Sequence, residues 1–196
     1  AFWLLILIAG VTSLASMSQL AFMFALVRQA IRDPLTGVFS RGSGEEILRL
    51  QWDSAQRKDG ALALAFIDLD HFKSINDNHG HEAGDQVLRC AARRLVTTLR
   101  ASDSLLRWGG EEFAILLPDT DAVAAARVAE RIRSSVRAAE IVQADGAESE
   151  MITVSVGTAT ALAGTPDPEE LLAMADRALY KAKALGGNRV VDKAAC

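Results

Sequence analysis

The chain has 196 residues, which is enough for one well-buried domain with an appendage. Its net charge of −4 and isoelectric point near 5.4 argue against a nucleic-acid-binding surface, which normally carries a basic excess, whereas a phosphorylated small molecule needs only a few local cations. The two cysteines, Cys90 and Cys196, lack the spacing of a zinc site, and two isolated thiols fit a reducing compartment.

The first 27 residues contain no charged side chain. A bilayer core needs about 20 apolar residues in a helix, so residues 1–32 are predicted to form a transmembrane or membrane-proximal signalling helix. Arg28 and Arg32 follow the run as cytoplasmic flanks do, which predicts an inner-membrane protein whose remaining residues lie in the cytoplasm. A buried or coiled-coil signalling helix is the alternative, although a soluble helix of this length usually has a charged face. Since the chain begins with Ala1 and no basic stretch precedes the run, we expect a C-terminal piece of a longer protein rather than a signal peptide.

A proline marks the boundary between this helix and the rest of the chain. Asp33-Pro34 should end the helix, because proline disfavours the helical conformation of the residue before it. We therefore divide the chain into a helix at residues 1–32 and a domain at residues 33–196. Apolar patterns and turn signals in that domain predict, in chain order, a helix at 44–57, a buried strand at 61–69, an irregular polar segment at 71–81, a helix at 82–99, hairpin strands at 105–108 and 112–117, a helix at 121–139, an irregular segment at 141–150, a strand at 151–161, a helix at 168–185 and an edge strand at 188–191.

The order of these elements begins with β-α-β-β-α-β, the split βαβ or ferredoxin-like plan of an α+β fold. In this plan the first strand and the hairpin lie side by side. Asp68, at the end of the first strand, is therefore expected near Glu111 of the hairpin, although about forty residues separate the two in the chain.

The turn of the predicted hairpin is Gly109-Gly110, and two acids, Glu111 and Glu112, follow it directly. A Gly-Gly pair tolerates the positive φ angles of a tight hairpin turn and leaves room for a large ligand to approach the backbone. Two adjacent carboxylates are costly to place together unless a cation lies near them. The pattern indicates a metal-dependent site for a phosphorylated ligand, although an ordinary surface hairpin with solvated acids has the same pattern.

Several further motifs accompany this hairpin in a fixed order. They are Asp33-Pro34-Leu35-Thr36-Gly37, Asp68-Leu69-Asp70-His71-Phe72-Lys73-Ser74-Ile75-Asn76-Asp77, Gly80-His81, Gly84-Asp85, Ser155-Val156-Gly157 and Ala175-Asp176-Arg177-Ala178-Leu179-Tyr180-Lys181-Ala182-Lys183. Together with the Gly-Gly-Glu-Glu-Phe hairpin they resemble the GGDEF family of diguanylate cyclases over about residues 33–192. The resemblance implies a palm-type domain, similar to polymerase and nucleotidyl cyclase cores. It also implies a homodimer that condenses two GTP into cyclic di-GMP and two pyrophosphates.

The resemblance implies a site of hard oxygen ligands for two Mg²⁺ or Mn²⁺ ions. The metal ligands would be Asp68, the Leu69 backbone carbonyl and Glu111. Glu112 and Lys73 would complete the catalytic residues, and the sequence leaves open which carboxylate takes the proton.

The resemblance also implies a pocket for GTP. Asn76 and Asp85 would read the guanine, because an acid that accepts from guanine N1 and N2 rejects adenine, which lacks those donors. The other substrate contacts would be Phe72, Lys73, His81, Gly109, Gly110 and Lys183.

A second site is implied just before the hairpin. Arg100 and Asp103 form an Arg-x-x-Asp with five residues before Gly109, and in this family that spacing resembles the site of product inhibition. The arginine offers a planar fork for guanine or phosphate, and the aspartate can accept from the guanine edge. Arg131, on the next helix, is a further candidate partner. An isolated Arg-x-x-Asp is also common without any function.

The chain departs from the family pattern at two positions. The family usually has Asn-Arg where this chain has Ser40-Arg41, which predicts a looser structural hydrogen bond. The family often has Arg where this chain has Gly187, so one phosphate contact is expected to be missing unless Arg189 reaches the ligand.

Several single residues near the motifs have more ordinary expectations. Asp70 is expected to be a structural partner rather than a ligand, and Trp108 to be a packing residue. Tyr180 taken alone predicts a core position. Asp176 and Arg177 are expected to support the site as second contacts rather than to form a surface pair.

Two other classes of function compete with the cyclase. The chain could be a catalytically idle receptor that binds cyclic di-GMP through Arg100 and Asp103, but the complete hairpin motif counts against this. A mere dimerisation module for an upstream sensor would not explain the guanine-reading residues.

Overall fold

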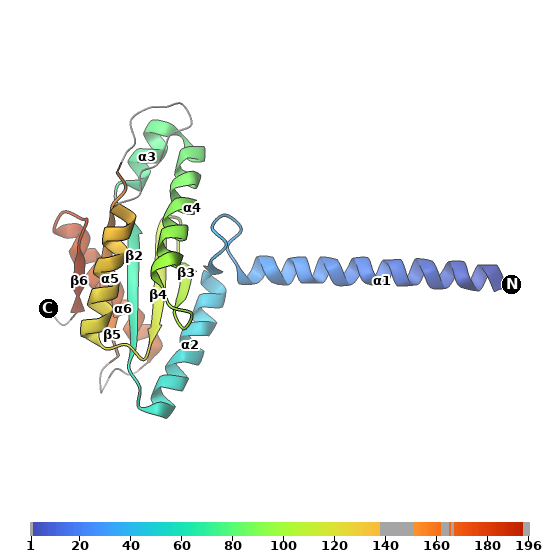
Figure 1. Cartoon of the computed structure of the whole chain (residues 1–196), viewed down its shortest axis with the longest axis horizontal. Helices are drawn as coiled ribbons and strands as arrows, with labels where there is room; N and C mark the ends of the chain where they lie inside the picture. Colours follow the sequence, from blue (N-terminus) through green and yellow to red (C-terminus); the bar gives the residue numbers. More distant parts are fainter. Residues whose placement is uncertain (1, 138–150, 162–164, 166, 194–196) are drawn as a thin grey trace.

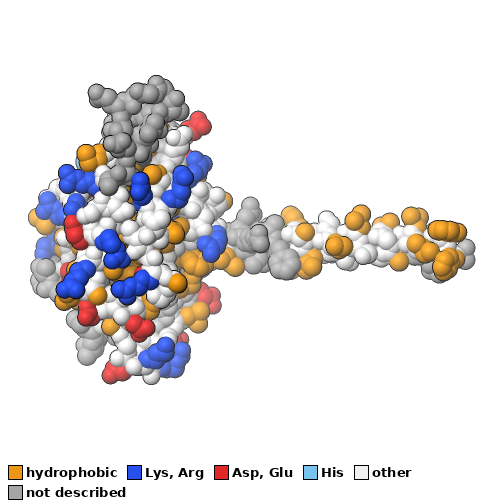
Figure 2. All heavy atoms as spheres, in the orientation of Figure 1, with side chains coloured by type: hydrophobic (Ala, Val, Ile, Leu, Met, Phe, Trp, Pro, Cys, Tyr) orange, Lys and Arg blue, Asp and Glu red, His pale blue; other side chains and the backbone are white. Residues whose placement is uncertain are grey.

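Helix α1 (Phe2–Ile31) projects away from the rest of the chain in the computed structural model (Figure 1). The structure describes residues 2–137, 151–161, 165 and 167–193, so the predicted irregular segment at 141–150 and Cys196 lie outside the described residues. Within that part of the chain, Phe2–Met23 is the one stretch of helix long and apolar enough to cross a membrane, with a mean hydropathy of 1.8 and no residue buried. Apolar side chains accordingly follow this stretch in Figure 2.

The rest of the described chain forms a six-stranded mixed sheet with helices on both faces (Figure 1). The strand order is β1-β3-β4-β2-β5-β6, and its four central strands follow the predicted ferredoxin-like plan. The elements are β1 (Phe39–Ser40), α2 (Arg41–Lys58), β2 (Leu62–Leu69), α3 (Phe72–His79), α4 (His81–Thr98), β3 (Ser104–Arg107), β4 (Glu112–Pro118), α5 (Ala122–Arg137), β5 (Val154–Thr160), α6 (Pro168–Ala184) and β6 (Val190–Asp192).

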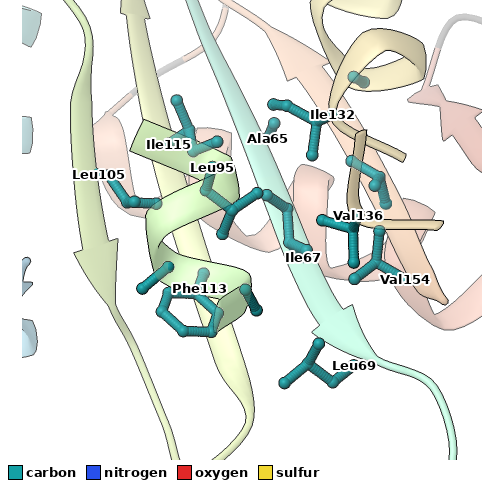
Figure 3. Close-up of a cluster of buried hydrophobic side chains, with 14 of the residues drawn as sticks. Ala65, Ile67, Leu69, Leu95, Leu105, Phe113, Ile115, Ile132, Val136 and Val154 are labelled. Carbon is teal, nitrogen blue, oxygen red and sulfur yellow. The ribbon is translucent and has the colours of Figure 1, made fainter. Parts of the chain in front are cut away.

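Strand β2 is buried along its whole length and divides the core into two layers. Its neighbours β4 and β5 both run antiparallel to it. Ala65, Ile67 and Leu69 face one layer, where α4 and α5 pack, as Figure 3 shows. Leu62, Leu64 and Phe66 face the other layer, which α2 and α6 cover. Since side chains alternate along a strand, Asp68 belongs to the layer of α2 and α6.

The structure corrects several predicted boundaries. Helix α2 begins at Arg41, three residues before its predicted start, because the Ser40 hydroxyl accepts the Ser43 N–H at the helix N-terminus. The polar segment at 71–81 contains the short helix α3, whose buried side chains, Phe72 and Ile75, stand among polar neighbours that concealed the helical pattern. Strand β1 was not predicted, since only two residues pair with β3.

Gly157 of β5 allows α6 to lie against the sheet at very short range. A Cβ atom placed on Gly157 would lie 2.1 Å from the Leu179 nitrogen and 2.3 Å from the Ala175 carbonyl oxygen. Both of these are backbone atoms, so no side-chain rotation can relieve the overlap. The close approach matters for function because α6 carries Lys183 in its last turn.

We predict that Gly157→Ala lowers the free energy of unfolding by about 3 kcal/mol, because the added methyl group forces α6 away from β5. Gly42→Ala is the matched control, since Gly42 is exposed on α2 and nothing lies within 4 Å of an added Cβ. The control should leave stability unchanged or raise it by up to about 1 kcal/mol, because alanine favours a helix more than glycine does. Urea unfolding of the full chain in detergent micelles measures both, and equal stabilities for the two variants would contradict the packing argument.

Candidate active site

The carboxylate of Asp68 is the buried acid around which the site is arranged. Asp68 is 3% exposed near the end of β2, where it lies opposite Glu112 of β4 and Ser155 of β5. Its Oδ2 atom forms an ion pair with the Lys183 ammonium of α6 at 2.5 Å. Its Oδ1 atom has no hydrogen-bond partner among the described residues. A buried acceptor without a partner is costly, which marks this oxygen as a place for a ligand.

The hairpin brings two further acids close to Asp68. Burial and the Asp68 carboxylate both raise the pKa of Glu111, and they do the same to the pKa of Glu112. Burial also raises the pKa of Asp68, and the Lys183 ammonium offsets only part of that rise. Three carboxylates thus share one region with one lysine, and a bound cation would relieve their mutual repulsion.

The residues present fit a magnesium site of the kind that nucleotide enzymes use. Among the described residues, no three His, Cys, Asp or Glu side chains are arranged to enclose a metal ion. Magnesium does not need such a cage, because it is commonly held by one or two carboxylates, by water and by substrate phosphates. The unpartnered Asp68 oxygen and the Glu111 carboxylate are hard donors of this kind. Leu69 joins β2 to the hairpin directly, since its N–H donates to the Glu111 carbonyl at 3.3 Å.

The turn of the hairpin differs from the predicted one. Neither Gly109 nor Gly110 has a positive φ angle, so the expectation that the turn needs glycine for its backbone conformation was wrong. A Cβ atom at Gly109 would lie 2.3 Å from Glu112 Oε2, so a larger residue there would displace the Glu112 carboxylate from its observed position. The Trp108 and Gly109 N–H groups both donate to the Glu112 carbonyl, at 2.8 and 3.2 Å. The small residue therefore lets the Glu112 side chain lie against the turn.

Arg107 ties this turn to the end of the long helix. Its guanidinium donates two hydrogen bonds to the Asp33 carboxylate, at 3.0 and 3.1 Å, and a third to the Gly110 carbonyl at 2.8 Å. The Thr36 N–H and hydroxyl donate to the same carboxylate. Burial alone would raise the pKa of Asp33, but these hydrogen bonds together hold it below its usual value. Both residues belong to motifs of the family resemblance, yet their pairing was not predicted because it joins positions 74 apart.

The predicted guanine-reading residues lie on the pair of helices beyond the carboxyl end of β2 (Figure 1). Asn76 of α3 is half-buried against Gly84 of α4, where an added Cβ would lie 2.0 Å from Asn76 Oδ1. Asp85 follows Gly84 directly and forms a loose ion pair with Arg89 at 3.7 Å. Asn76 and Asp85 thus lie near each other at one crossing of the two helices. Phe72 is buried at the start of α3, whereas Lys73 and His81 are exposed.

Asp70 has the structural role that was predicted for it. Its carboxylate accepts hydrogen bonds from Thr153, Ser155 and the backbone N–H of Asn188, at 2.7, 2.6 and 2.9 Å. It therefore fixes the turn that follows α6, and with it the end of the helix that carries Lys183. Gly187, in the same turn, has a φ angle of +72°, and a Cβ there would lie 2.9 Å from Asp70 Oδ1.

The two departures from the family pattern have structural explanations. An arginine at position 187 would need to move Asp70 or the turn, so the turn observed here requires glycine. Arg189 donates to the Gly187 carbonyl of its own turn at 3.1 Å. Ser40 caps α2, so the Ser-for-Asn replacement keeps a helix cap at that position.

Three expectations for neighbouring residues have mixed outcomes. Trp108 packs edge-to-face against Phe66 with a 5.8 Å separation of ring centroids, which confirms the packing role. Tyr180 is 76% exposed, so its predicted core position was wrong. Arg177 forms a surface ion pair with Glu170 at 2.6 Å, so its predicted role as a support of the site was also wrong. Its neighbour Asp176 does act there, because it adds to the effects of burial and of the Asp68 charge that raise the pKa of Glu112.

The second predicted site surrounds the turn between α4 and β3. The Asp103 carboxylate accepts the backbone N–H of Arg100 at 2.9 Å, which holds the two residues of the motif together. Arg131 of α5 donates to the Thr98 carbonyl at 2.8 Å, two residues before Arg100. The structure thus brings all three predicted residues to one end of α4, directly before the strand that leads to the hairpin.

Comparisons with known proteins identify the family of this chain. The family model described as diguanylate cyclase, GGDEF domain, matches residues 30–189. The chain is 45% identical over 172 residues to the response regulator PleD of Caulobacter vibrioides, covering 85% of this chain and 37% of PleD. It is 42% identical over 163 residues to the diguanylate cyclase DgcP of Pseudomonas aeruginosa, covering 83% of this chain and 24% of DgcP.

Solved structures show the same fold. The coiled coil and GGDEF domain of DgcB from Caulobacter crescentus, solved in complex with c-di-GMP, superposes with a TM-score of 0.85 at 32% identity and covers 92% of this chain and 95% of DgcB's. The chain therefore belongs to the GGDEF-domain diguanylate cyclase family. It spans well under half the length of PleD and of DgcP.

We predict that Glu111→Gln stabilises the folded chain at pH 8 when no divalent metal is present. Folding raises the pKa of Glu111, so its ionised carboxylate costs stability above that pKa, and the cost disappears below about pH 4, where the carboxyl is protonated in both states. The melting temperature of the variant should exceed that of the wild type by a few degrees at pH 8, and the difference should vanish towards pH 4.

Glu46→Gln is the control for this prediction, because Glu46 is an exposed glutamate of α2. It should leave the melting temperature unchanged over the same pH range. Added Mg²⁺ should raise the melting temperature of the wild type more than that of Glu111→Gln. A Glu111→Gln variant that melts below the wild type at pH 8 without metal would show that the carboxylate stabilises the fold, contrary to the electrostatic argument.

Proposed function

We propose that this chain is the catalytic part of a diguanylate cyclase that condenses two GTP into cyclic di-GMP. The observation that carries the proposal is the buried Asp68 carboxylate, which has one oxygen on Lys183 and the other without a partner among the described residues, beside the two acids of the hairpin. Acids whose pKa values are raised by burial and by a neighbouring charge are typical of functional sites. Family membership over residues 30–189 supports the same reaction.

The reaction requires little covalent help from the protein. The 3′-oxygen of one GTP forms a bond to the α-phosphorus of the other, the bond from that phosphorus to the bridging oxygen breaks, and pyrophosphate leaves. The hydroxyl proton passes to a carboxylate of the hairpin, Glu111 or Glu112, whose pKa is raised by burial and by the Asp68 charge. A second, identical step closes the ring. Each domain holds one GTP, so the proposed active unit is a homodimer with facing sites.

The remaining residues would bind the triphosphate of GTP and neutralise its negative charge. Lys183 and Lys73 supply cations for the triphosphate, and the Phe72 and Lys73 N–H groups lie at the start of α3, where a helix favours anions. Gly109 and Gly110 leave the hairpin backbone open to the nucleotide. Asp68, the Leu69 carbonyl and Glu111 would hold two Mg²⁺ or Mn²⁺ ions, which would neutralise phosphate charge and acidify the attacking hydroxyl.

Specificity for guanine is assigned to the crossing of α3 and α4. The Asp85 carboxylate can accept from guanine N1 and N2, and the Asn76 amide can donate to the guanine oxygen or N7. His81, exposed at the first turn of α4, would contact the base or ribose.

The chain is further proposed to act at the inner face of a membrane, with α1 as the anchor. Phe2–Met23 is long enough to span the hydrocarbon core. The alignment with the coiled-coil form of DgcB supports the alternative that this helix pairs as a coiled coil. In either case α1 would set how two domains face each other, and product bound at Arg100, Asp103 and Arg131 would provide feedback.

The deciding experiment is GTP turnover by the full chain in detergent micelles with Mg²⁺. We expect cyclic di-GMP and pyrophosphate in a 1:2 ratio, and a loss of at least about a hundredfold in kcat for Glu111→Gln. Glu46→Gln should retain full turnover. A chain that binds cyclic di-GMP but makes none under these conditions would be an idle receptor, and the proposed activity would be refuted.

Guanine recognition gives an independent prediction. Asp85→Asn should raise the KM for GTP about tenfold or more with a smaller change in kcat, because it removes a charged acceptor from the base. The wild type should prefer GTP over inosine triphosphate, which lacks the N2 amino group, and this preference should shrink in the variant. Glu82→Gln, at an exposed position of the same helix, is the control. Unchanged discrimination in Asp85→Asn would remove this residue from the guanine site.

A further inference from the structure

The turn between α6 and β6, residues 185–189, has a backbone that needs support from outside. Gly186, Gly187 and Asn188 have φ angles of +106°, +72° and +47° in succession. Glycine adopts such angles readily and asparagine at some cost, but three left-handed residues in a row persist only where surrounding contacts hold them. The Gly186 N–H also donates to the Lys183 carbonyl at 2.9 Å. Whatever holds this turn therefore also places the end of α6.

Asn188 is the residue at which the turn is held. Its backbone N–H donates to the Asp70 carboxylate, just beyond the end of β2, at 2.9 Å. Its side chain and its carbonyl both accept from Arg133 of α5, whose Nη1 atom lies 2.6 Å from Asn188 Oδ1 and 3.5 Å from the carbonyl oxygen. The left-handed conformation of Asn188 is thus fixed from two sides, by Asp70 and by Arg133.

Arg133 is itself held in one orientation. Its Nε and Nη2 atoms donate to the two carboxylate oxygens of Glu130, at 2.9 and 2.6 Å, and its side chain is 17% exposed. These hydrogen bonds raise the pKa of Arg133 and hold the pKa of Glu130 below its usual value. The guanidinium is a rigid fork, so fixing two of its nitrogens also fixes the third, Nη1, which binds Asn188.

This contact joins the two layers of the domain at one edge of the sheet. Helix α5 packs on the layer that contains Ala65 and Ile67, whereas α6 packs on the opposite layer. Strand β6 follows the turn directly and is the edge strand beside β5 (Figure 1). Arg133 therefore links α5, which carries no residue of the site around Asp68, to the end of α6 on the other face of the sheet.

We propose that Arg133 is a positioning residue for Lys183: through Asn188 it fixes the turn after α6 and so keeps the Lys183 ammonium beside Asp68. The inference rests on the proposed function, because it takes the triphosphate of GTP as the ligand of Lys183. Lys183 is 42% exposed in the last turn of α6, so its ion pair with Asp68 depends on where the helix ends. Its side chain is long and flexible, so a displaced helix end would weaken this contact rather than abolish it.

Binding of a GTP analogue to the full chain, measured by calorimetry in detergent micelles with Mg²⁺, tests the inference. The analogue has a methylene group in place of the oxygen between its α- and β-phosphorus, so it binds without turnover. Arg133→Gln should weaken binding about tenfold, because the Lys183 ammonium loses its fixed position. Arg127→Gln is the matched control, since Arg127 is an exposed arginine of the same helix, and it should bind within about twofold of the wild type.

A second variant removes the contact without altering α5. Asn188→Gly keeps a residue that accepts the positive φ angle but lacks the side-chain acceptor for Arg133. It should weaken binding as much as Arg133→Gln does, and the double variant should bind no more weakly than either single variant. Arg133→Lys should restore little of the affinity, since one ammonium group cannot bind both oxygens of Glu130 and Asn188 at once.

A double-variant cycle with Lys183→Gln separates positioning from a general loss of structure. If Arg133 acts through Lys183, Arg133→Gln should weaken binding by less than about twofold once Lys183 has been replaced. In turnover, Arg133→Gln should raise the KM for GTP about tenfold with less than about a threefold change in kcat. Amide hydrogen exchange at Asn188 should also accelerate in Arg133→Gln, because the turn loses one of its two supports.

Wild-type affinity in both Arg133→Gln and Asn188→Gly would overturn the inference, and so would an equal loss of affinity with and without Lys183. Unchanged exchange at Asn188 in Arg133→Gln would overturn it whatever the chain binds. A wild-type chain that binds no analogue, with exchange at Asn188 accelerated in Arg133→Gln, would refute the proposed function and leave the support of the turn by Arg133 standing.

Discussion

The burial of Asp68 among like charges is the constraint on which the active-site end of this fold depends. Its carboxylate lies below the surface with Lys183 as its ion-pair partner, and the two acids of the hairpin stand close enough for its charge to raise their proton affinity. Such a group lowers the stability of the empty site and increases the gain when a cation or a cation-bound phosphate arrives. Binding of a cation would therefore also relieve the repulsion among the three carboxylates. Functional sites commonly carry this kind of local cost.

The surrounding structure holds these charges in place with contacts that do not touch the ligand. Asp70 fixes the turn after α6 through the Asn188 backbone, and Gly157 lets α6 lie directly on β5. Both contacts determine the position of the last turn of α6, and therefore the position of the Lys183 ammonium group beside Asp68. On the other side, Arg107 fixes the Gly110 carbonyl and thereby the hairpin. The geometry at Asp68 is thus set by two elements, α6 and the hairpin, which are restrained by three contacts outside the site.

Sequence patterns predicted the plan of the four central strands and the proximity of Asp68 to the hairpin acids. Both depend on strong local signals, namely a buried apolar run for β2 and glycines beside acids for the hairpin. The predictions failed where a tertiary contact decides the outcome. Tyr180 is an aromatic residue, yet it lies outside the buried face of α6, whose inward side chains include Ala175, Ala178 and Ala182, so it is exposed. The pairing of Asp33 with Arg107 depends on chain folding over a long separation, which no local pattern encodes. Gly109 was expected to supply a positive φ angle, but its φ is not positive, and an added Cβ would instead meet the neighbouring Glu112 side chain.

The Asp33–Arg107 pair also joins the end of α1 to the hairpin of the domain. Arg32 and Asp33 follow α1 directly, and the Asp33 carboxylate accepts hydrogen bonds from Thr36 in its own turn and from Arg107 across the sheet edge. Under the proposed function two domains must face each other, and alignment of two bound substrates contributes about 7–11 kcal/mol to such a bimolecular reaction. The proposed dimer would therefore respond strongly to a rotation of α1 that these hydrogen bonds carried into the domain. A short, hydrogen-bonded junction suits that proposed role better than a flexible connection would.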